Sequence, residues 1–210
     1  MLFLDELPEF SRAACEALRQ PLEEGEVTVS RSMTSVRFPA RFALIAAANP
    51  CPCGHLGDSR SACRCSLYDL HRYASRLSGP LLDRIDLYVQ AERLTADELT
   101  RAADAEPTAR VRTRVLTARA LQRSRQGAEN GRLAPADIAA HCQLTQPARR
   151  TLMAAVDRLG LSARGFHRAL RVARTVADLA GADRVEDHHL KEALSLRYLP
   201  IIGDREAQLI

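Results

Sequence analysis

Hydrophobic positions in the first half of the chain follow an α/β pattern. Leu2–Leu4 form a short apolar run that ends at two acids, and Phe42–Ala48 form a longer run that ends at an asparagine. Continuous apolar runs of this length are typical of strands that are buried on both faces. A further strand is predicted at Ile85–Ala91. These runs predict a partial parallel sheet.

The segments between these strands carry helix and hairpin patterns. Pro8–Gln20 places its apolar residues near one helical face, and Pro21 is expected to end that helix. Gly25–Arg41 alternates valines with polar residues around a polar tip, which predicts a β-hairpin. Leu67–Leu77 predicts a helix, and Leu81–Arg84 a short helical turn.

The pattern changes near Thr95, and only helical periodicities follow it. Prolines and glycines interrupt these periodicities at intervals typical of helix ends. We therefore expect two domains, an α/β part over residues 1–93 and an all-α part over residues 94–210.

Composition places the chain among ordinary globular proteins. It is 46% hydrophobic and 27% charged, and its net charge of +4 is too small to establish nucleic-acid binding. No apolar run has the length of a membrane span, and acids follow the first four residues, unlike in a signal peptide. We expect a cytoplasmic protein without membrane contact, whose six cysteines are thiols or metal ligands rather than disulfides.

Polar side chains follow the first two apolar runs directly. Asp5 and Glu6 end the first run, and Asn49 ends the second. If the two strands are neighbours, these side chains share the edge where open α/β sheets build their sites. In a P-loop ATPase, such an Asp helps to hold Mg²⁺ and such a Glu polarises the attacking water. The alternatives are a solvated acidic turn and an asparagine that bonds its own backbone.

Four cysteines form two close pairs in the Cys51–Ser66 segment, which has no periodicity. The pattern is CxC, nine residues, then CxC, with two glycines that let the loop bend. Four thiolates suit a tetrahedral structural zinc ion, and His55 is a substitute ligand. Four free thiols or a disulfide are the alternatives. The predicted ligands are Cys51, Cys53, Cys63 and Cys65.

Several arginines occupy positions where phosphates could be bound. Arg84 lies at the start of the third predicted strand, and Arg164 and Arg171 lie on a predicted helix. Arg31 and Arg37 flank the tip of the hairpin, where they could follow a nucleic-acid backbone. Intrachain ion pairs and solvated basic surfaces are the alternatives.

Five segments together resemble the magnesium-chelatase-like AAA+ ATPases of the ComM (YifB) family. They are LFLDELPEF, FALIAAANPCPCGHLGD, CRCS, SGPLLDRIDL and ARGFHRALRVARTVADLAG. The resemblance implies the C-terminal portion of a P-loop AAA+ domain with a β-hairpin insertion, followed by a helical lid. It makes Asp5 and Glu6 the Walker B acids and Asn49 the sensor-1 residue. Arg84 becomes the arginine finger.

The lid arginines and the partners follow from the same resemblance. Arg164 is the first candidate for sensor 2 and Arg171 the second. ATP and Mg²⁺ become the cofactors, and a homo-oligomeric ring, expected to be a hexamer, becomes the assembly. The hairpin would face the central pore and contact DNA, branched or single-stranded. Two other functions stay open: a chelatase subunit acting on a tetrapyrrole, and a non-enzymatic module that binds zinc and DNA.

One family motif does not occur in the 210 residues. This is the P-loop, GxxxxGKS or GxxxxGKT, whose backbone amides and lysine hold the phosphates. The resemblance places its strand between the strand ending at Asn49 and the one at Ile85–Ala91. We therefore expect a C-terminal fragment that does not hydrolyse ATP alone. We also expect unpaired edges on its apolar strands, which favour aggregation.

Overall fold

The computed structural model describes residues 1–31, 34–58, 60–91, 93–100 and 105–197. The described chain forms two compact units, the first built on Met1–Ile85 and the second on Asp86–Leu199. The division therefore comes earlier than the boundary expected at residue 93. Residues after Ile85 belong to the second unit because the Tyr88 amide donates to the Leu196 carbonyl oxygen at 2.6 Å.

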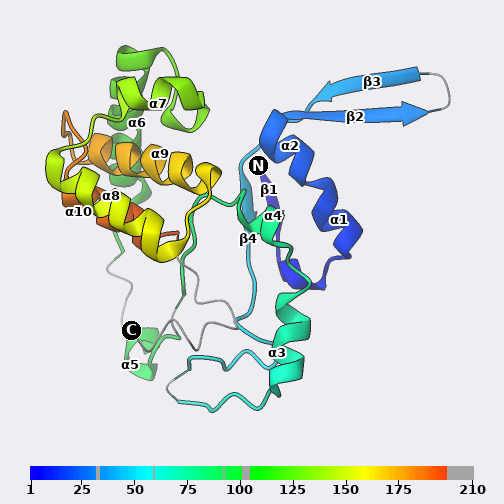
Figure 1. The fold of residues 1–210 in the computed structure, drawn as a ribbon. Helices are drawn as coiled ribbons and strands as arrows, with labels where there is room; N and C mark the ends of the chain where they lie inside the picture. Colours follow the sequence, from blue (N-terminus) through cyan, green and yellow to red (C-terminus); the bar gives the residue numbers. More distant parts are fainter. Residues whose placement is uncertain (32–33, 59, 92, 101–104, 198–210) are drawn as a thin grey trace. The chain divides into compact units, whose positions relative to one another are not determined.

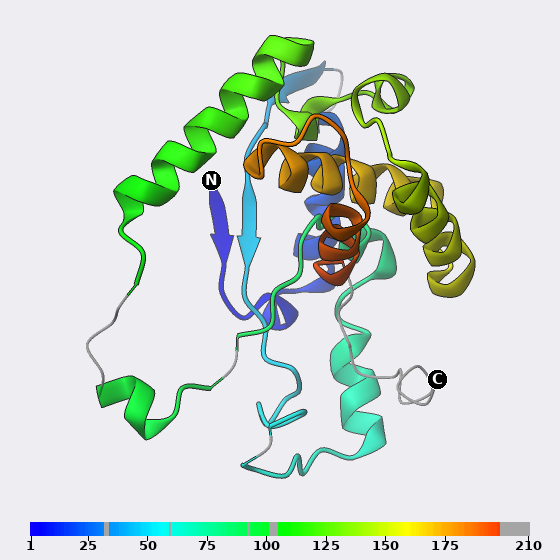
Figure 2. The same cartoon turned by 90° about the vertical axis from the view of Figure 1, so that its left-hand side faces the viewer.

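The first unit contains a two-stranded parallel sheet. Strand β1 (Leu2–Leu4) pairs with β4 (Leu44–Ala46), and Figure 2 shows the two strands side by side. The predicted neighbourhood of the strands is confirmed, but the expected burial on both faces is wrong. Phe3 is 60% exposed and Ile45, directly opposite it, is 47% exposed. Among the described residues, no further strand extends this sheet.

The strand expected at Ile85–Ala91 is a second correction. The segment is described throughout and joins no strand ladder with any described residue. A strand needs a neighbour for its backbone groups. None of the described residues forms a strand beside this segment, so its backbone groups join no ladder there.

Two short helices replace the single helix expected at Pro8–Gln20. A 3₁₀ turn (η1, Leu7–Glu9) precedes α1 (Arg12–Ala17), and α2 (Arg19–Glu24) follows at once. Pro21 does not end a helix but lies in the first turn of α2, where backbone amides have no partner within the helix. The core of this unit gathers Leu7, Cys15 and Leu81.

The predicted hairpin is confirmed. Strands β2 (Glu26–Arg31) and β3 (Thr34–Pro39) are antiparallel, and Figure 1 shows them extending together from the end of α2. Gly25 joins α2 to β2 with a φ of 71°, a left-handed conformation that favours glycine.

The rest of the first unit is the cysteine loop and two helices. Helix α3 (Leu67–Ala74) confirms the prediction and ends three residues early, and α4 (Gly79–Leu82) corresponds to the predicted helical turn. Serines cap both helices: the Ser66 and Ser78 hydroxyls accept amide hydrogen bonds from the first turn.

The second unit is helical, apart from one isolated parallel bridge between Leu144 and Val185. Its core is formed by the inward faces of α7 to α10, and α6 packs on α9. None of the described helices is long and apolar enough to cross a membrane. The helices are α5 (Ala96–Thr100), α6 (Thr108–Gln126), η2 (Asn130–Arg132), α7 (Pro135–His141), α8 (Gln146–Leu159), α9 (Ala163–Leu179) and α10 (Asp187–Ser195).

Candidate functional site

The parallel pairing of β1 and β4 brings two polar segments to one edge of the sheet. Hydrogen bonds tie the chains together beyond the strands: the Ala47 amide donates to the Leu4 carbonyl, and the Leu7 amide to the Ala47 carbonyl, both at 2.9 Å. Asp5 and Glu6 lie between these bonded residues, and Asn49 lies two residues beyond Ala47. Two carboxylates and an amide therefore come to the carboxyl edge of the sheet.

Glu6 has an unusual backbone at this edge. Its φ of 50° and ψ of 47° are left-handed, and it is the non-glycine residue with positive φ among those described. Its amide donates to the Asp5 carboxylate at 3.0 Å. Such a conformation costs about 1–3 kcal/mol and persists only where surrounding structure imposes it, often at functional sites. The bonds from Ala47 and Leu7 supply that constraint on either side of the two acids.

The main chain of Asn49 is fixed from α3. The buried Tyr73 hydroxyl donates to the Asn49 carbonyl oxygen at 3.0 Å. Burial raises the pKa of Tyr73, so the phenol keeps its proton and remains a donor. Asn49 itself is exposed, and its backbone is held while its side chain faces solvent.

Arg84 is engaged within the first unit. Its Nε lies 2.9 Å from a carboxylate oxygen of Glu23, and its Nη1 donates to the Pro80 carbonyl at 2.6 Å. Only 8% of the side chain is exposed. The structure thus shows an intrachain ion pair, one of the alternatives considered for this arginine. A contact with a neighbouring subunit would require Arg84 to exchange Glu23 for a new partner.

The two arginines predicted to contact nucleotide lie on α9 in the second unit. Arg164 is exposed in the first turn, and Arg171 is half-buried and donates to the Leu133 carbonyl. Arg164 is therefore the more accessible of the two.

The hairpin register places Arg37 on the polar face of the hairpin. Side chains alternate along a strand, and Arg37 lies opposite Thr28, whereas Arg31 lies opposite Thr34. The Arg37 face is polar, and the other face carries apolar pairs such as Val29 with Val36. The side chain of Arg31 lies outside the described residues.

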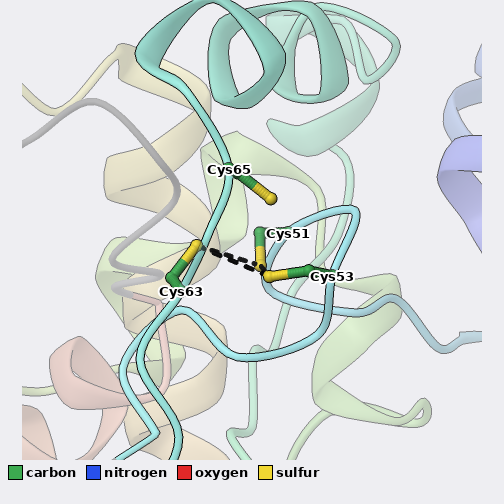
Figure 3. Close-up of side chains that lie close together, drawn as sticks. All are labelled: Cys51, Cys53, Cys63 and Cys65. Carbon is green, nitrogen blue, oxygen red and sulfur yellow. Dashed lines mark hydrogen bonds between the residues drawn. The ribbon is translucent and has the colours of Figure 1, made fainter.

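The four cysteines of the loop converge, as Figure 3 shows. The Cys51 Sγ lies 3.4 Å from that of Cys53 and 3.7 Å from that of Cys63, and the latter two are 3.6 Å apart. All four Sγ atoms, including that of Cys65, lie within 4.8 Å of one another. Zinc–sulfur bonds of about 2.3 Å in a tetrahedron place sulfurs about 3.8 Å apart. The four thiols are therefore compatible with a zinc ion.

Hydrogen bonds and burial shift the pKa values of the thiols in this loop in opposite directions. The amides of Arg64 and His55 lower the pKa of Cys53 to about 6, whereas burial raises the pKa of Cys65 to about 12. The Leu56 amide donates to the Cys51 Sγ at 3.3 Å. Four cysteine thiols suffice for a tetrahedral ion, so His55, whose Nδ1 lies 3.6 Å from an Asp58 carboxylate oxygen, is not needed as a ligand.

A buried polar network in the second unit was missed by the sequence analysis. The Asp178 carboxylate accepts two bonds from Arg125, at 2.6 and 2.9 Å, one from Arg174 at 3.1 Å and one from Asn130 at 2.7 Å. Arg125 is thus engaged inside the second unit through both terminal nitrogens of its guanidinium group. An arginine and an aspartate four residues apart on the apolar face of α9 were the available signal.

Electrostatics hold Asp178 in its charged form. Burial raises the pKa of this carboxyl, but the hydrogen bonds from Arg125 and Asn130 and the charge of Arg174 outweigh it, so the pKa lies below its usual value. Arg174 is itself fully buried and also donates to the Asp183 carbonyl at 2.8 Å. The network therefore joins α6, η2, α9 and the turn that follows α9.

Sequence comparisons give the class of protein. A profile described as "Magnesium chelatase, subunit ChlI" matches residues 1–99, and a profile for the C-terminal part of the same subunit matches residues 105–197. The chain belongs to the magnesium-chelatase-like family, as the resemblance predicts.

Curated relatives place it more finely. The chain is 45% identical over 198 residues to "Competence protein ComM" of Haemophilus influenzae, and 43% and 41% identical to proteins named YifB of Salmonella typhimurium and Escherichia coli. Each match covers 94% of this chain but only 38% or 39% of the relative. The chain thus spans less than two fifths of the length of these proteins.

Proposed function

We propose that this chain supplies the C-terminal part of an ATP-driven AAA+ ring motor of the ComM type. The observation that carries the proposal is the parallel pairing of β1 with β4, which brings Asp5, Glu6 and Asn49 to one edge. In this account Asp5 helps to hold Mg²⁺, Glu6 polarises the attacking water, and Asn49 orients it. The nucleotide would supply the phosphoryl group, and the Mg²⁺ ion would supply positive charge that stabilises its transfer.

Arginines complete the proposed nucleotide site. Arg84 acts as an arginine finger towards the nucleotide of a neighbouring subunit after it leaves Glu23. Arg164 contacts nucleotide from the lid, with Arg171 as the second candidate. The P-loop motif is absent from the 210 residues, so we propose that this chain by itself does not hydrolyse ATP.

The proposed substrate of the motor is DNA, branched or single-stranded, and the proposed assembly is a homo-oligomeric ring, a hexamer. Support comes from the similarity to a protein named for competence and from a hairpin that carries arginines near its tip. In this account the motor moves DNA through the ring, with Arg31 and Arg37 contacting phosphates.

We propose a structural zinc ion on Cys51, Cys53, Cys63 and Cys65. The sulfur separations support it, as does the amide that donates to Cys51. Four protein ligands leave no open position, so the ion would cross-link the two arms of the loop rather than take part in the reaction.

A chimera tests the motor. This chain would replace the matching 198 residues of the Haemophilus influenzae relative, and ATP turnover would be measured with and without branched DNA. We expect turnover that DNA stimulates, and a loss of about 100- to 10,000-fold in Glu6→Gln, which removes the general base. Unchanged turnover in Glu6→Gln would refute the assigned role.

A second candidate is a magnesium-chelatase subunit acting on a tetrapyrrole, because both matching profiles carry that description. The chimera separates the two. Stimulation of its turnover by DNA supports the DNA motor, whereas stimulation by a magnesium-free tetrapyrrole with the chelatase partner subunits, and none by DNA, supports the chelatase.

A further inference from the structure

Helix α3 and the residues directly after it contact both polar segments at the carboxyl edge of the sheet. The Tyr73 hydroxyl donates to the Asn49 carbonyl oxygen at 3.0 Å. Two residues beyond the end of α3, the Arg76 Nη1 donates to the Pro8 carbonyl oxygen at 3.2 Å. Pro8 lies in the turn that follows Glu6. The helix is therefore fixed to the segments that carry the amide and the two acids.

The bond from Tyr73 fixes the main chain of Asn49 and not its side chain. Tyr73 is 9% exposed, whereas Asn49 is exposed. The carbonyl oxygen accepts the phenol hydrogen, so the side-chain amide takes no part in the bond. On the other side of Asn49, the Ala47 amide donates to the Leu4 carbonyl oxygen at 2.9 Å. The main chain is thus held on both sides, while the amide is left to meet a water at the edge.

The bond from Tyr73 joins two segments that the cysteine cluster also joins. Asn49 lies two residues before Cys51, and α3 begins two residues after Cys65. The Sγ atoms of Cys51 and Cys63 are 3.7 Å apart, a separation that one zinc ion would hold. Two cross-links between the same segments support each other, because each shortens the loop that the other has to close.

The start of α3 transmits the position of the cluster to the helix. The Asp69 amide donates to the Ser66 hydroxyl and the Ser66 amide donates to the Asp69 carboxylate, both at 3.2 Å. This capping box fixes the first turn of α3 directly after Cys65. Tyr73 lies two turns further along the same helix. A displacement of the cysteines would therefore also displace the phenol that holds Asn49.

We propose that Tyr73 is a positioning residue for Asn49, and that a metal ion on the four cysteines supports this placement. The inference rests on the proposed function, in which Asn49 orients the attacking water. A displacement of about 1 Å in such a group can lower a rate about 100-fold. Tyr73 would thus set the rate of the chemical step without touching the nucleotide, and the metal content of the loop would affect turnover from outside the site.

Hydrogen exchange of the zinc-loaded chain, followed by mass spectrometry, tests the placement without catalysis. Tyr73→Phe removes only the hydroxyl, and the peptide that contains Asn49 should exchange about two- to tenfold faster because one hydrogen bond is lost. Tyr68→Phe is the matched control, since it removes a hydroxyl from an exposed tyrosine of the same helix and should change nothing. Unchanged exchange in Tyr73→Phe would refute the positioning role.

The same measurement tests the part of the metal. Cys53→Ser removes one of the four ligands and should speed the exchange of the Asn49 peptide, as Tyr73→Phe does. Cys142→Ala, a change of a buried cysteine in the second unit, should leave this peptide unaffected. Equal exchange in Cys53→Ser and the native chain would refute the support by the metal.

ATP turnover of the chimera tests whether Tyr73 acts through Asn49. Tyr73→Phe should lower kcat about ten- to 100-fold and leave KM for ATP within about twofold. In a chimera that already carries Asn49→Ala, the same change should lower kcat by less than about twofold, because no amide remains to be positioned. Tyr68→Phe should turn over ATP normally. A loss of equal size in both backgrounds would show that Tyr73 only supports the fold, and would overturn the inference.

The outcomes separate this inference from the proposed function. If Glu6→Gln and Asn49→Ala lower turnover but Tyr73→Phe does not, the positioning role is refuted and the motor stands. If Asn49→Ala leaves turnover unchanged, Tyr73 has no orienting group to position, and the inference is refuted as well. The motor is then judged separately, by the effect of Glu6→Gln.

Discussion

The Asp178 carboxylate accepts hydrogen bonds from two arginines and an asparagine inside the second unit. We therefore expect its replacement to lower the stability of the fold. Asp178→Asn leaves the buried Arg174 without its counter-charge. We expect it to lower the free energy of unfolding by about 3–5 kcal/mol. Urea unfolding followed by circular dichroism measures this. Asp157→Asn, on the exposed face of α8, is the control and should change stability by less than about 0.5 kcal/mol.

The same residue predicts a dependence on pH. Because the pKa of Asp178 is lower in the folded protein, its contribution is complete above its unfolded value, about 3.9, and is lost as the pH falls through the folded value. The free energy of unfolding should therefore fall below pH 4 more steeply in the native chain than in Asp178→Asn. Parallel curves for the two proteins would show that Asp178 does not titrate in this way.

The cysteine cluster predicts a metal content. Zinc measured by plasma mass spectrometry should be about one ion per chain, and Cys53→Ser should remove most of it because one of four ligands is lost. Cys142→Ala changes a buried cysteine of the second unit and should leave the content unchanged. Equal zinc in Cys53→Ser and the native chain would contradict the assignment.

Among the elements, the sheet exposes an apolar cross-strand pair. Phe3 and Ile45 face each other across β1 and β4, and both are about half exposed or more. Such a surface on a two-stranded sheet favours association with other chains. Ile45→Thr should therefore reduce aggregation of the isolated chain, measured by light scattering at constant concentration. Met153→Thr, an exposed residue of α8, should have no such effect.

The hairpin makes a different prediction because its two arginines lie at different distances from the tip. Arg31→Ala, next to the tip, should weaken DNA binding by the intact assembly and lower the salt slope by about one phosphate. Arg37 lies further from the tip, so the effect of Arg37→Ala should be smaller. The measurement is a salt titration of binding to branched DNA. No change in Arg31→Ala would exclude the tip as a contact.

Elements whose signals are local were predictable from the sequence, and those that depend on a neighbour were not. The hairpin and α3 follow from alternation and helical periodicity, and both are found. Ile85–Ala91 has the composition of a strand, but none of the described residues forms a strand beside it, and its Tyr88 amide bonds to the Leu196 carbonyl instead. Pro21 was expected to stop a helix, but a proline in the first turn sacrifices no helical bond.

The residues of the candidate site were likewise predictable where their signal is local and not where it depends on residues far away in the sequence. The two acids, Asn49 and the four cysteines could be found because they follow apolar runs or recur at short spacing. The pair of Arg84 with Glu23 and the network of Asp178 could not, because each joins residues that lie far apart along the chain. The pairing of Arg37 with Thr28 depends on the exact register of the hairpin.

At the scale of the whole molecule, the account assigns two halves of one catalytic site to different subunits of a ring. Glu6 would serve the nucleotide of its own subunit, and Arg84 the nucleotide of the next. Chimeric subunits carrying Glu6→Gln lack the first, and those carrying Arg84→Ala lack the second. Glu23→Gln is the control, because it frees Arg84 from its intrachain pair and leaves the guanidinium in place.

The most direct test is ATP turnover by a mixture of the Glu6→Gln and Arg84→Ala chimeras. Each alone should be inactive, with Arg84→Ala reduced by about 1,000-fold or more, while Glu23→Gln stays active. The mixture should regain turnover, because an Arg84→Ala subunit keeps its Glu6 and receives Arg84 from a Glu6→Gln neighbour. A mixture that stays inactive, or Glu23→Gln as inactive as Arg84→Ala, would contradict the account.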